Sequence, residues 1–180
     1  MSKAVLMSIQ PKWVEQIVSG KKTIEVRKTK PKLGTPFKGY IYEAYDKKYA
    51  NTGFYWFETR HTFVHGCKKV IGEFVCDYIT PFRPKSLLCD SEIVKKTCVN
   101  LGELIKYAPD KPFPKDHIYG WHISQLKIYD NPKELSEFKR WNRTEDNAPC
   151  AHTKWLYPDC KDCTECNLTR PPQSWVYVED

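Results

Sequence analysis

Residues 20–27, GKKTIEVR, carry the strongest structural signal in the chain. Gly20 can adopt the left-handed conformation that ends a helix, and polar and apolar side chains alternate after it. A period of two is typical of a half-buried strand, in which Glu25 and Arg27 point to the same face. The stretch therefore predicts a helix that ends at Gly20 and leads into a strand with one polar face.

The segments around this junction predict further helices and strands. Pro11 suits the first turn of a helix, which apolar residues at helical spacing extend to Ser19. Ser91 can cap a second helical stretch, one bent helix or two short ones, which Pro109 stops. Gly72 is expected to mark a bulge or a tight bend in its strand. Strands are predicted at residues 4–8, 39–45, 69–80 and 117–129, and within 171–179.

The composition is that of a globular domain without a membrane span. The chain has 180 residues, 41% of them hydrophobic and 28% charged, enough for one well-buried domain and a small appendage. No window approaches the roughly eighteen apolar residues of a membrane helix, and the start lacks a secretory pattern. We therefore expect a cytoplasmic protein with no membrane contact. The net charge of +7 favours polyanionic partners.

The junction resembles the signature of the ASCH domain family, G-x-K-x-x-E-x-R. Every fixed position is filled here, by Gly20, Lys22, Glu25 and Arg27. Later segments are similar to the family's central and late strands, so the resemblance covers roughly residues 3–138.

The resemblance implies a fold and a division of the chain. We expect an α+β fold, a small PUA-like mixed β-barrel with flanking helices, over residues 1–138. Residues 139–180 are expected to form a cysteine-rich extension that packs on the barrel. This extension resembles a subgroup found in phage and prophage proteins of Gram-positive bacteria.

The resemblance also implies a groove that binds nucleic acid, RNA in particular, or a modified nucleotide. Some ASCH proteins are acetylcytidine amidohydrolases, and others are ribonucleases. In the amidohydrolases the lysine that matches Lys22 takes part in catalysis, together with a threonine at the position of Glu25 and a later glutamate. Glu25 departs from that pattern, and Glu92 or Glu103 is a candidate for the later glutamate.

Lys22, Glu25 and Arg27 are the candidate ligand-binding residues. A lysine donor, a carboxylate and a guanidinium fork at one junction can converge on a base edge or a phosphate. The alternative is a surface ion pair between Glu25 and Arg27 with little functional meaning. Seven basic residues against one acid between positions 21 and 38 would attract a phosphate backbone, or would form an ordinary solvated face.

Aromatic residues supply candidate platforms for bases. A ring-rich stretch at residues 46–69 follows neither period and is predicted as an ordered loop or a hairpin insertion. Its Tyr55, Trp56 and Phe57 can stack on unpaired bases if exposed, or pack over the barrel. Trp121 and its histidine neighbour must point to opposite faces of a strand, and we expect Trp121 to face the groove as a base platform.

Four cysteines near the C-terminus have metal-ligand spacing. Cys150, Cys160, Cys163 and Cys166 form C-x9-C-x2-C-x2-C in a segment poor in core-forming residues. In a reducing compartment such clusters favour metal over disulfides. Four thiolates complete a structural zinc site, whose binding supplies folding energy that the segment lacks. His152 can replace Cys150, and free thiols, disulfides or another cluster are the alternatives.

Three functions remain open at this point. The leading hypothesis is a module that binds RNA or DNA, in which Lys22, Glu25 and Arg27 recognise a nucleotide and zinc braces the barrel. The rival is an enzyme, a base-directed amidohydrolase or a ribonuclease, with Lys22 as activator or charge stabiliser and Glu25 as acid or base. The third is a protein-interaction adaptor. The sequence predicts no oligomeric state.

Overall fold

The computed structural model describes residues 2–56, 61–86, 90–112, 116–141 and 166–180, leaving aside the side chains at positions 55, 56 and 61. Its helices are α1 (Pro11–Val18), α2 (Ser91–Thr97) and α3 (Leu101–Tyr107), with a 3-10 helix η1 (Leu135–Glu137). Its strands are β1 (Lys3–Ile9), β2 (Ile24–Arg27), β3 (Phe37–Glu43), β4 (Gly53–Trp56), β5 (His61–Val64), β6 (Lys69–Cys76), β7 (Ile79–Phe82), β8 (Ile118–His122), β9 (Ser124–Glu134) and β10 (Trp175–Glu179). The predicted α+β class is confirmed. None of these helices is long and apolar enough to cross a membrane.

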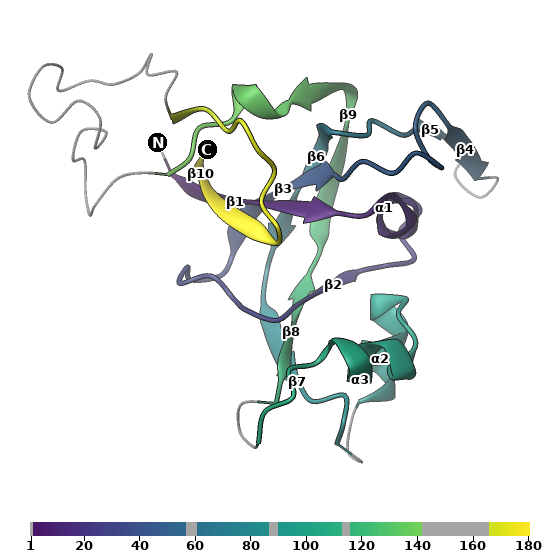
Figure 1. The fold of residues 1–180 in the computed structure, drawn as a ribbon, viewed down its shortest axis with the longest axis vertical. Helices are drawn as coiled ribbons and strands as arrows, with labels where there is room; N and C mark the ends of the chain where they lie inside the picture. Colours follow the sequence, from purple (N-terminus) through teal and green to yellow (C-terminus); the bar gives the residue numbers. More distant parts are fainter. Residues whose placement is uncertain (1, 57–60, 87–89, 113–115, 142–165) are drawn as a thin grey trace, which may run out of the picture.

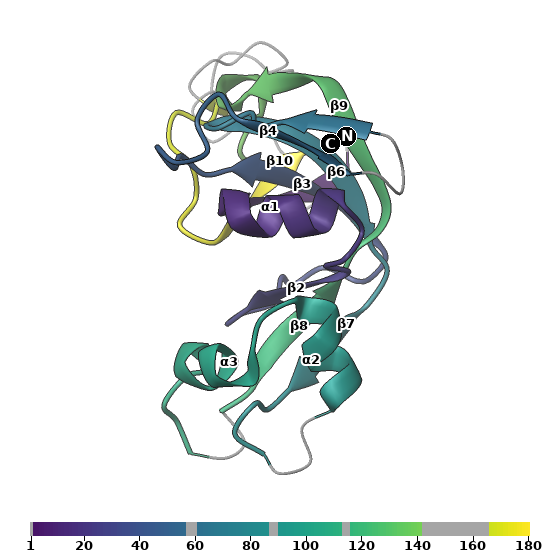
Figure 2. The ribbon, with the colours of Figure 1, turned by 90° about the vertical axis from the view of Figure 1, so that its right-hand side faces the viewer.

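The main sheet has five strands in the order β10-β1-β3-β6-β9 (Figure 1). Strands β1 and β3 are parallel, and the other neighbouring strands are antiparallel. Helix α1 covers one face of this sheet, where Val14 and Ile17 pack in the same core as Ile41 (Figure 2). Pro11 begins the helix, and Gly20 follows its end with a φ of 75°, as the sequence predicts.

A second sheet has three strands in the order β2-β8-β7. The chain crosses between the sheets four times: from β1 through α1 to β2, from β2 to β3, from β6 to β7 through residues 77–78, and from β8 to β9 through Ile123. Helices α2 and α3 cover the second sheet, where Leu104 packs with Val26 and Ile118 (Figure 2). The predicted β-barrel is not closed among the described strands. The two sheets are joined by these crossings rather than by one continuous hydrogen-bonded ladder, and β9 and β10 are edges of the main sheet.

Three segments give detail that the sequence left open. The helical stretch that begins at Ser91 is two helices, because Cys98 adopts a left-handed φ of 54° between them. The ring-rich stretch contains the antiparallel hairpin β4–β5. A bulge lies beside Gly72, where the pairing of β6 with both of its neighbours shifts register, as expected.

The end of the cysteine-rich extension completes the main sheet. Strand β10 pairs with β1, and the Asp180 carboxylate accepts hydrogen bonds from Tyr40 and Ser2. Lys38 forms an ion pair with Asp180 at 2.7 Å. The structure describes residues 139–141 and 166–180 of this extension, and the division of the chain after residue 138 stays a prediction.

Replacing Gly72 by alanine tests the close approach of β6 and β9. A Cβ atom at this position would lie 2.4 Å from the Lys127 carbonyl oxygen, a backbone atom that cannot rotate away. We expect Gly72→Ala to lower the free energy of unfolding by about 1–3 kcal/mol in urea denaturation. Gly34→Ala is the control, because its added Cβ meets nothing within 4 Å. Equal unfolding midpoints for the two variants would contradict the predicted contact.

Candidate functional site

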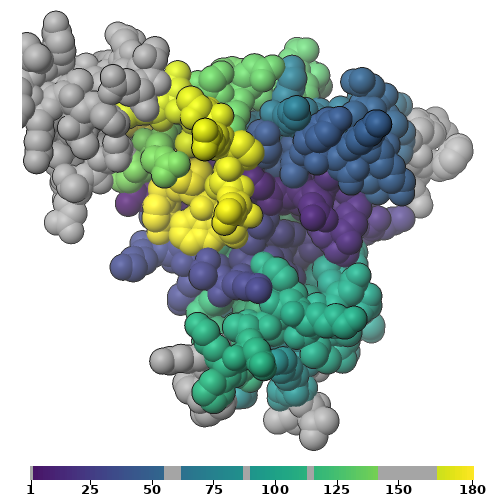
Figure 3. Space-filling model, in the orientation of Figure 1, coloured from purple at the N-terminus to yellow at the C-terminus, as the bar shows by residue number. Residues whose placement is uncertain are grey.

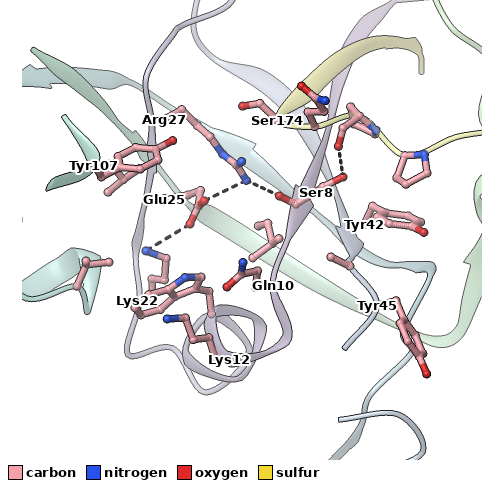
Figure 4. A pocket seen from close by; sticks show the side chains of 18 of the residues that line it. Ser8, Gln10, Lys12, Lys22, Glu25, Arg27, Tyr42, Tyr45, Tyr107 and Ser174 are labelled. Carbon is pink, nitrogen blue, oxygen red and sulfur yellow. Dashed lines mark hydrogen bonds and ion pairs between the residues drawn. The ribbon is translucent and has the colours of Figure 1, made fainter. Parts of the chain in front are cut away.

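A cavity of about 1130 Å³ lies between the two sheets and the segments that cover them (Figure 4). Figure 3 shows two of its contributors on one face of the molecule, the C-terminal segment in yellow and the α2–α3 region in teal. The end of β1, helix α1 and strand β2 supply further lining residues. The charged residues of the lining are Lys12, Lys22, Glu25, Arg27, Lys68, Glu103 and Lys106.

Lys22, Glu25 and Arg27 form a continuous chain of ion pairs at this cavity, here called the buried triad. The Lys22 ammonium lies 3.3 Å from one Glu25 carboxylate oxygen, and Arg27 Nη2 lies 3.0 Å from the other. The three residues are only 2%, 6% and 7% exposed. Glu25 therefore bridges Lys22 and Arg27, and all three predicted ligand-binding side chains lie below the surface of the protein.

Backbone carbonyl groups hold the two ends of the buried triad. Lys22 Nζ donates a hydrogen bond to the Thr97 carbonyl oxygen at 2.6 Å, where α2 ends. Arg27 Nη2 donates to the Ser8 carbonyl oxygen of β1 at 2.8 Å (Figure 4). The triad therefore ties β2 to α2 on one side and to β1 on the other.

The burial of β2 corrects the expectation of a half-buried strand. All four of its residues are buried, so Glu25 and Arg27 do not form the exposed ion pair considered as an alternative. Removing a charge from water costs several kcal/mol even after relaxation, and pairing must offset that cost. Arg27 Nε is also buried, and within the described part of the chain it has no hydrogen-bond partner. An unpaired buried donor costs about 1–3 kcal/mol, and Arg27 lines the cavity.

Aromatic rings that the sequence analysis did not select also line the cavity. The Trp13 ring lies beneath two ammonium groups, with Lys12 Nζ 4.3 Å and Lys22 Nζ 5.2 Å from its centroid. Burial raises the pKa of the Tyr107 phenol on α3, and Glu25 adds to this rise while Arg27 opposes it. A signal for Trp13 was present, because it lies beside Lys12 about two helical turns before the signature. The sequence holds no local signal for Tyr107.

The predicted base platforms lie elsewhere or are not described. Trp121 has no exposed surface and packs edge-on against Phe37 in the core, with ring centroids 5.6 Å apart. This placement corrects the expectation that Trp121 faces the groove. As alternation along the strand predicts, His122 points the other way, and its Nε2 lies 3.1 Å from the Thr80 hydroxyl oxygen. Phe57 and the side chains of its two predecessors lie outside the described part of the chain.

The remaining predicted site residues are the two candidate glutamates and the zinc ligands, and only some of them lie at the cavity or in the described part of the chain. Glu103 lines the cavity, whereas Glu92 is exposed and paired with Lys95. Most of the predicted zinc ligands, Cys150, Cys160 and Cys163, lie outside the described residues, as does His152. Cys166 is buried, and its carbonyl oxygen accepts a hydrogen bond from the Arg140 backbone. The described residues hold no cluster of three or more potential metal ligands, so the zinc site stays a prediction.

The buried triad predicts a large stability effect at its centre. Glu25→Gln keeps the shape of the side chain but leaves two buried cations without their carboxylate, so the free energy of unfolding should fall by on the order of 3 kcal/mol. Urea denaturation measures this loss. Glu92→Gln makes the same chemical change at an exposed pair and should leave the midpoint unchanged. A Glu25→Gln protein as stable as the wild type would show that the triad does not hold β2 in place.

Comparisons with known proteins agree with this architecture. The family model described as "ASCH domain" matches residues 7–166. No curated protein sequence gives a match. The solved structure of ASCH from Zymomonas mobilis aligns with a TM-score of 0.51 at 18% identity, over 73% of each chain.

Two variants of the Zymomonas mobilis protein ZmASCH align in the same way. A Tyr-to-Phe variant gives a TM-score of 0.52 at 18% identity, over 74% of this chain and 77% of its own. A Ser-to-Ala variant gives 0.57 at 17% identity, over 98% of this chain and 88% of its own. These low identities support a shared fold alone. Because the family model spans most of the sequence, the chain belongs to the ASCH domain family.

Proposed function

We propose that this protein binds RNA, through a nucleotide that enters the cavity at the buried triad. The observation that carries the proposal is the combination of three buried charges with an unpaired Arg27 Nε donor, all at one cavity. Ligand pockets have volumes of about 300–1,000 Å³, so a cavity of about 1130 Å³ can hold a nucleotide with room for part of its neighbour.

The cavity offers separate partners for the phosphate and for the base. Lys12, Lys68 and Lys106 supply positive charge from three different segments of its lining, against the single additional carboxylate of Glu103. Lysine side chains attract phosphate through charge and release counterions on binding. The Trp13 ring is a candidate surface for stacking a base, an interaction worth about 1–3 kcal/mol. Membership of the ASCH family supports the same class of ligand.

An enzymatic function is the second candidate, and one contact favours it. The Lys22 ammonium and the Glu25 carboxylate lie 3.3 Å apart at the cavity, within reach of a shared proton. Such a pair can act as general acid and base on an amide of a modified base or on a phosphodiester. Both side chains are already engaged, Lys22 with Thr97 and Glu25 with Arg27. Reaction would require a substrate to replace one of these contacts, whereas binding would not.

Arg27→Met tests the binding proposal. The substitution removes the unpaired donor and one buried charge, so we expect short single-stranded RNA to bind about 10- to 100-fold more weakly at low salt, measured by fluorescence anisotropy. Lys133→Met removes a positive charge from β9, outside the cavity lining, and should change the affinity little. Equal affinities for the two variants, or no binding of RNA or nucleosides by the wild type, would contradict the proposal.

The same samples distinguish binding from turnover. Wild-type protein is incubated with short RNAs and a panel of modified nucleosides, and the mixtures are analysed for products. A product that the wild type forms and a folded Lys22→Met variant does not would establish the enzymatic candidate. Binding without any product would support a reader of RNA.

We also propose that Cys150, Cys160, Cys163 and Cys166 bind a structural zinc ion. The support is their spacing and the closed tetrahedral site that four thiolates form. Cys166 lies three residues before Thr169, the first residue of the C-terminal part of the cavity wall. A bound zinc would therefore brace the segment that leads to the cavity and to β10. The likeness of this extension to phage-type members stays an expectation.

Metal analysis tests the zinc proposal. Protein purified without chelator should contain about one zinc ion per chain, and Cys163→Ser should lower this content and the thermal midpoint together. Cys98→Ser changes a cysteine outside the cluster and should keep the zinc. Zinc far below one equivalent in the wild type would show that the cysteines have another role.

A further inference from the structure

A second group of buried titratable side chains lies apart from the triad. His65 follows strand β5, and its Nδ1 contacts the Glu43 carboxylate at the end of β3. Its Nε2 lies 3.2 Å from the Glu15 carboxylate on helix α1. The His65 and Glu43 side chains are 1% and 0% exposed, and Glu15 is 32% exposed. One imidazole therefore bridges a strand of the main sheet and the helix that covers it.

The same imidazole anchors the segment that contains the β4–β5 hairpin. The rings of Tyr49, Phe54 and Phe63 surround it, with centroids 5.1, 5.9 and 5.2 Å from its own. The His65 backbone N–H donates to the Thr52 carbonyl oxygen at 2.8 Å. The described parts of this segment, residues 44–56 and 61–68, are thus attached to the body of the protein around one histidine.

The geometry of these contacts requires a proton. A neutral imidazole has one N–H, yet both ring nitrogens of His65 face carboxylate oxygens. Both contacts are hydrogen bonds only if the imidazole is cationic or one carboxyl group is protonated. In either case the three groups together hold one proton more than a neutral histidine and two carboxylates do.

We propose that Glu15, Glu43 and His65 form a proton-dependent clamp that holds residues 44–56 and 61–68 against α1 and thereby regulates the shape of the candidate site. Loss of the shared proton would set two lone pairs against each other and remove one of the two hydrogen bonds. The attachment of the hairpin therefore weakens as the pH rises.

The clamp reaches the cavity through the two ends of the segment. Tyr45 and Lys68 both line the cavity, and Lys68 Nζ lies 4.5 Å from the centroid of the Tyr45 ring. The Lys68 backbone N–H donates to the Glu43 carbonyl oxygen at 2.8 Å. A shift of Glu43 would therefore also move Lys68, and with it the part of the cavity wall that Tyr45 and Lys68 form. The link to ligand binding rests on the proposed function, whereas the clamp itself does not.

The titration of neighbouring groups agrees with this direction. Burial raises the pKa of Glu43, although the hydrogen bond with His65 opposes the rise. A carboxyl group with a raised pKa in the closed state stabilises that state at low pH and loses this effect as the pH rises through the raised value. Among the described residues, the titratable or charged groups at His65 and Glu43 are Glu15 from α1, Tyr49 from the turn after β3, and Cys67 and Lys68 from the turn before β6, with Asp46 next to Cys67.

Hydrogen exchange measured by NMR tests the clamp directly. In the wild type, the protection of the β4–β5 amides, relative to intrinsic exchange at each pH, should fall as the pH rises from weakly acidic to alkaline values. One linked proton limits the fall to about tenfold per pH unit. Glu43→Gln supplies a permanent N–H to His65 Nδ1, so its hairpin protection should stay constant over the same range.

Asp110→Asn is the matched control, since it converts an exposed carboxylate paired with Lys85 to an amide and should keep the wild-type pH dependence. Wild-type hairpin protection that does not change with pH would overturn the proposal, and this measurement stands even if Glu43→Gln fails to fold. So would a Glu43→Gln protein with the wild-type slope. RNA affinity is measured on the same series and should fall with pH in the wild type more than in Glu43→Gln. Absence of RNA binding at every pH, with the protection slope intact, would refute the proposed function and leave the clamp established.

Discussion

The position of Glu25 between Lys22 and Arg27 is the interaction on which the arrangement of the two sheets depends. None of the three charges is exposed enough to be stabilised by water alone, so each requires the others. Their remaining hydrogen bonds go to backbone carbonyls of Ser8 and Thr97. Strand β2 is therefore fixed between β1 and the end of α2, and the cavity lies where these elements meet.

Ion pairs of this kind are an inefficient way to stabilise a core, because well-packed apolar residues often give equal or greater stability. The triad lines a cavity and leaves Arg27 Nε without a partner among the described residues, and the proposed binding of a nucleotide would give such an arrangement a purpose. The Glu43–His65 pair follows the same logic at a second place. These two buried titratable groups attach the β4–β5 hairpin to the main sheet, and in the proposed clamp this attachment depends on pH.

The sequence allowed the helix-to-strand junction and the grouping of Lys22, Glu25 and Arg27 at one site to be predicted, because both rest on local spacing around Lys22, whereas the burial and pairing of the three charges were not predicted. It could not show that all of β2 is buried, since Val26 packs with Leu104 of α3 and Arg27 bonds the Ser8 carbonyl oxygen of β1, contacts that no local pattern indicates. The same limit explains Trp121: alternation separates it from its neighbour, but only packing against Phe37 and other residues of the main sheet decides which side is the core. Glu43 and His65 are 22 residues apart and share no pattern that would have paired them.

The Arg27 guanidinium offers the sharpest test of whether a nucleotide binds at the buried triad. Its Nε–H signal can be followed by ¹⁵N NMR while nucleoside monophosphates and short single-stranded RNAs are added to the wild-type protein. If a nucleotide enters the cavity at the buried triad, this signal should shift and its exchange with water should slow in step with binding. Saturable binding of RNA that leaves the Arg27 Nε–H signal unchanged would place the ligand elsewhere and show that no nucleotide binds at the buried triad.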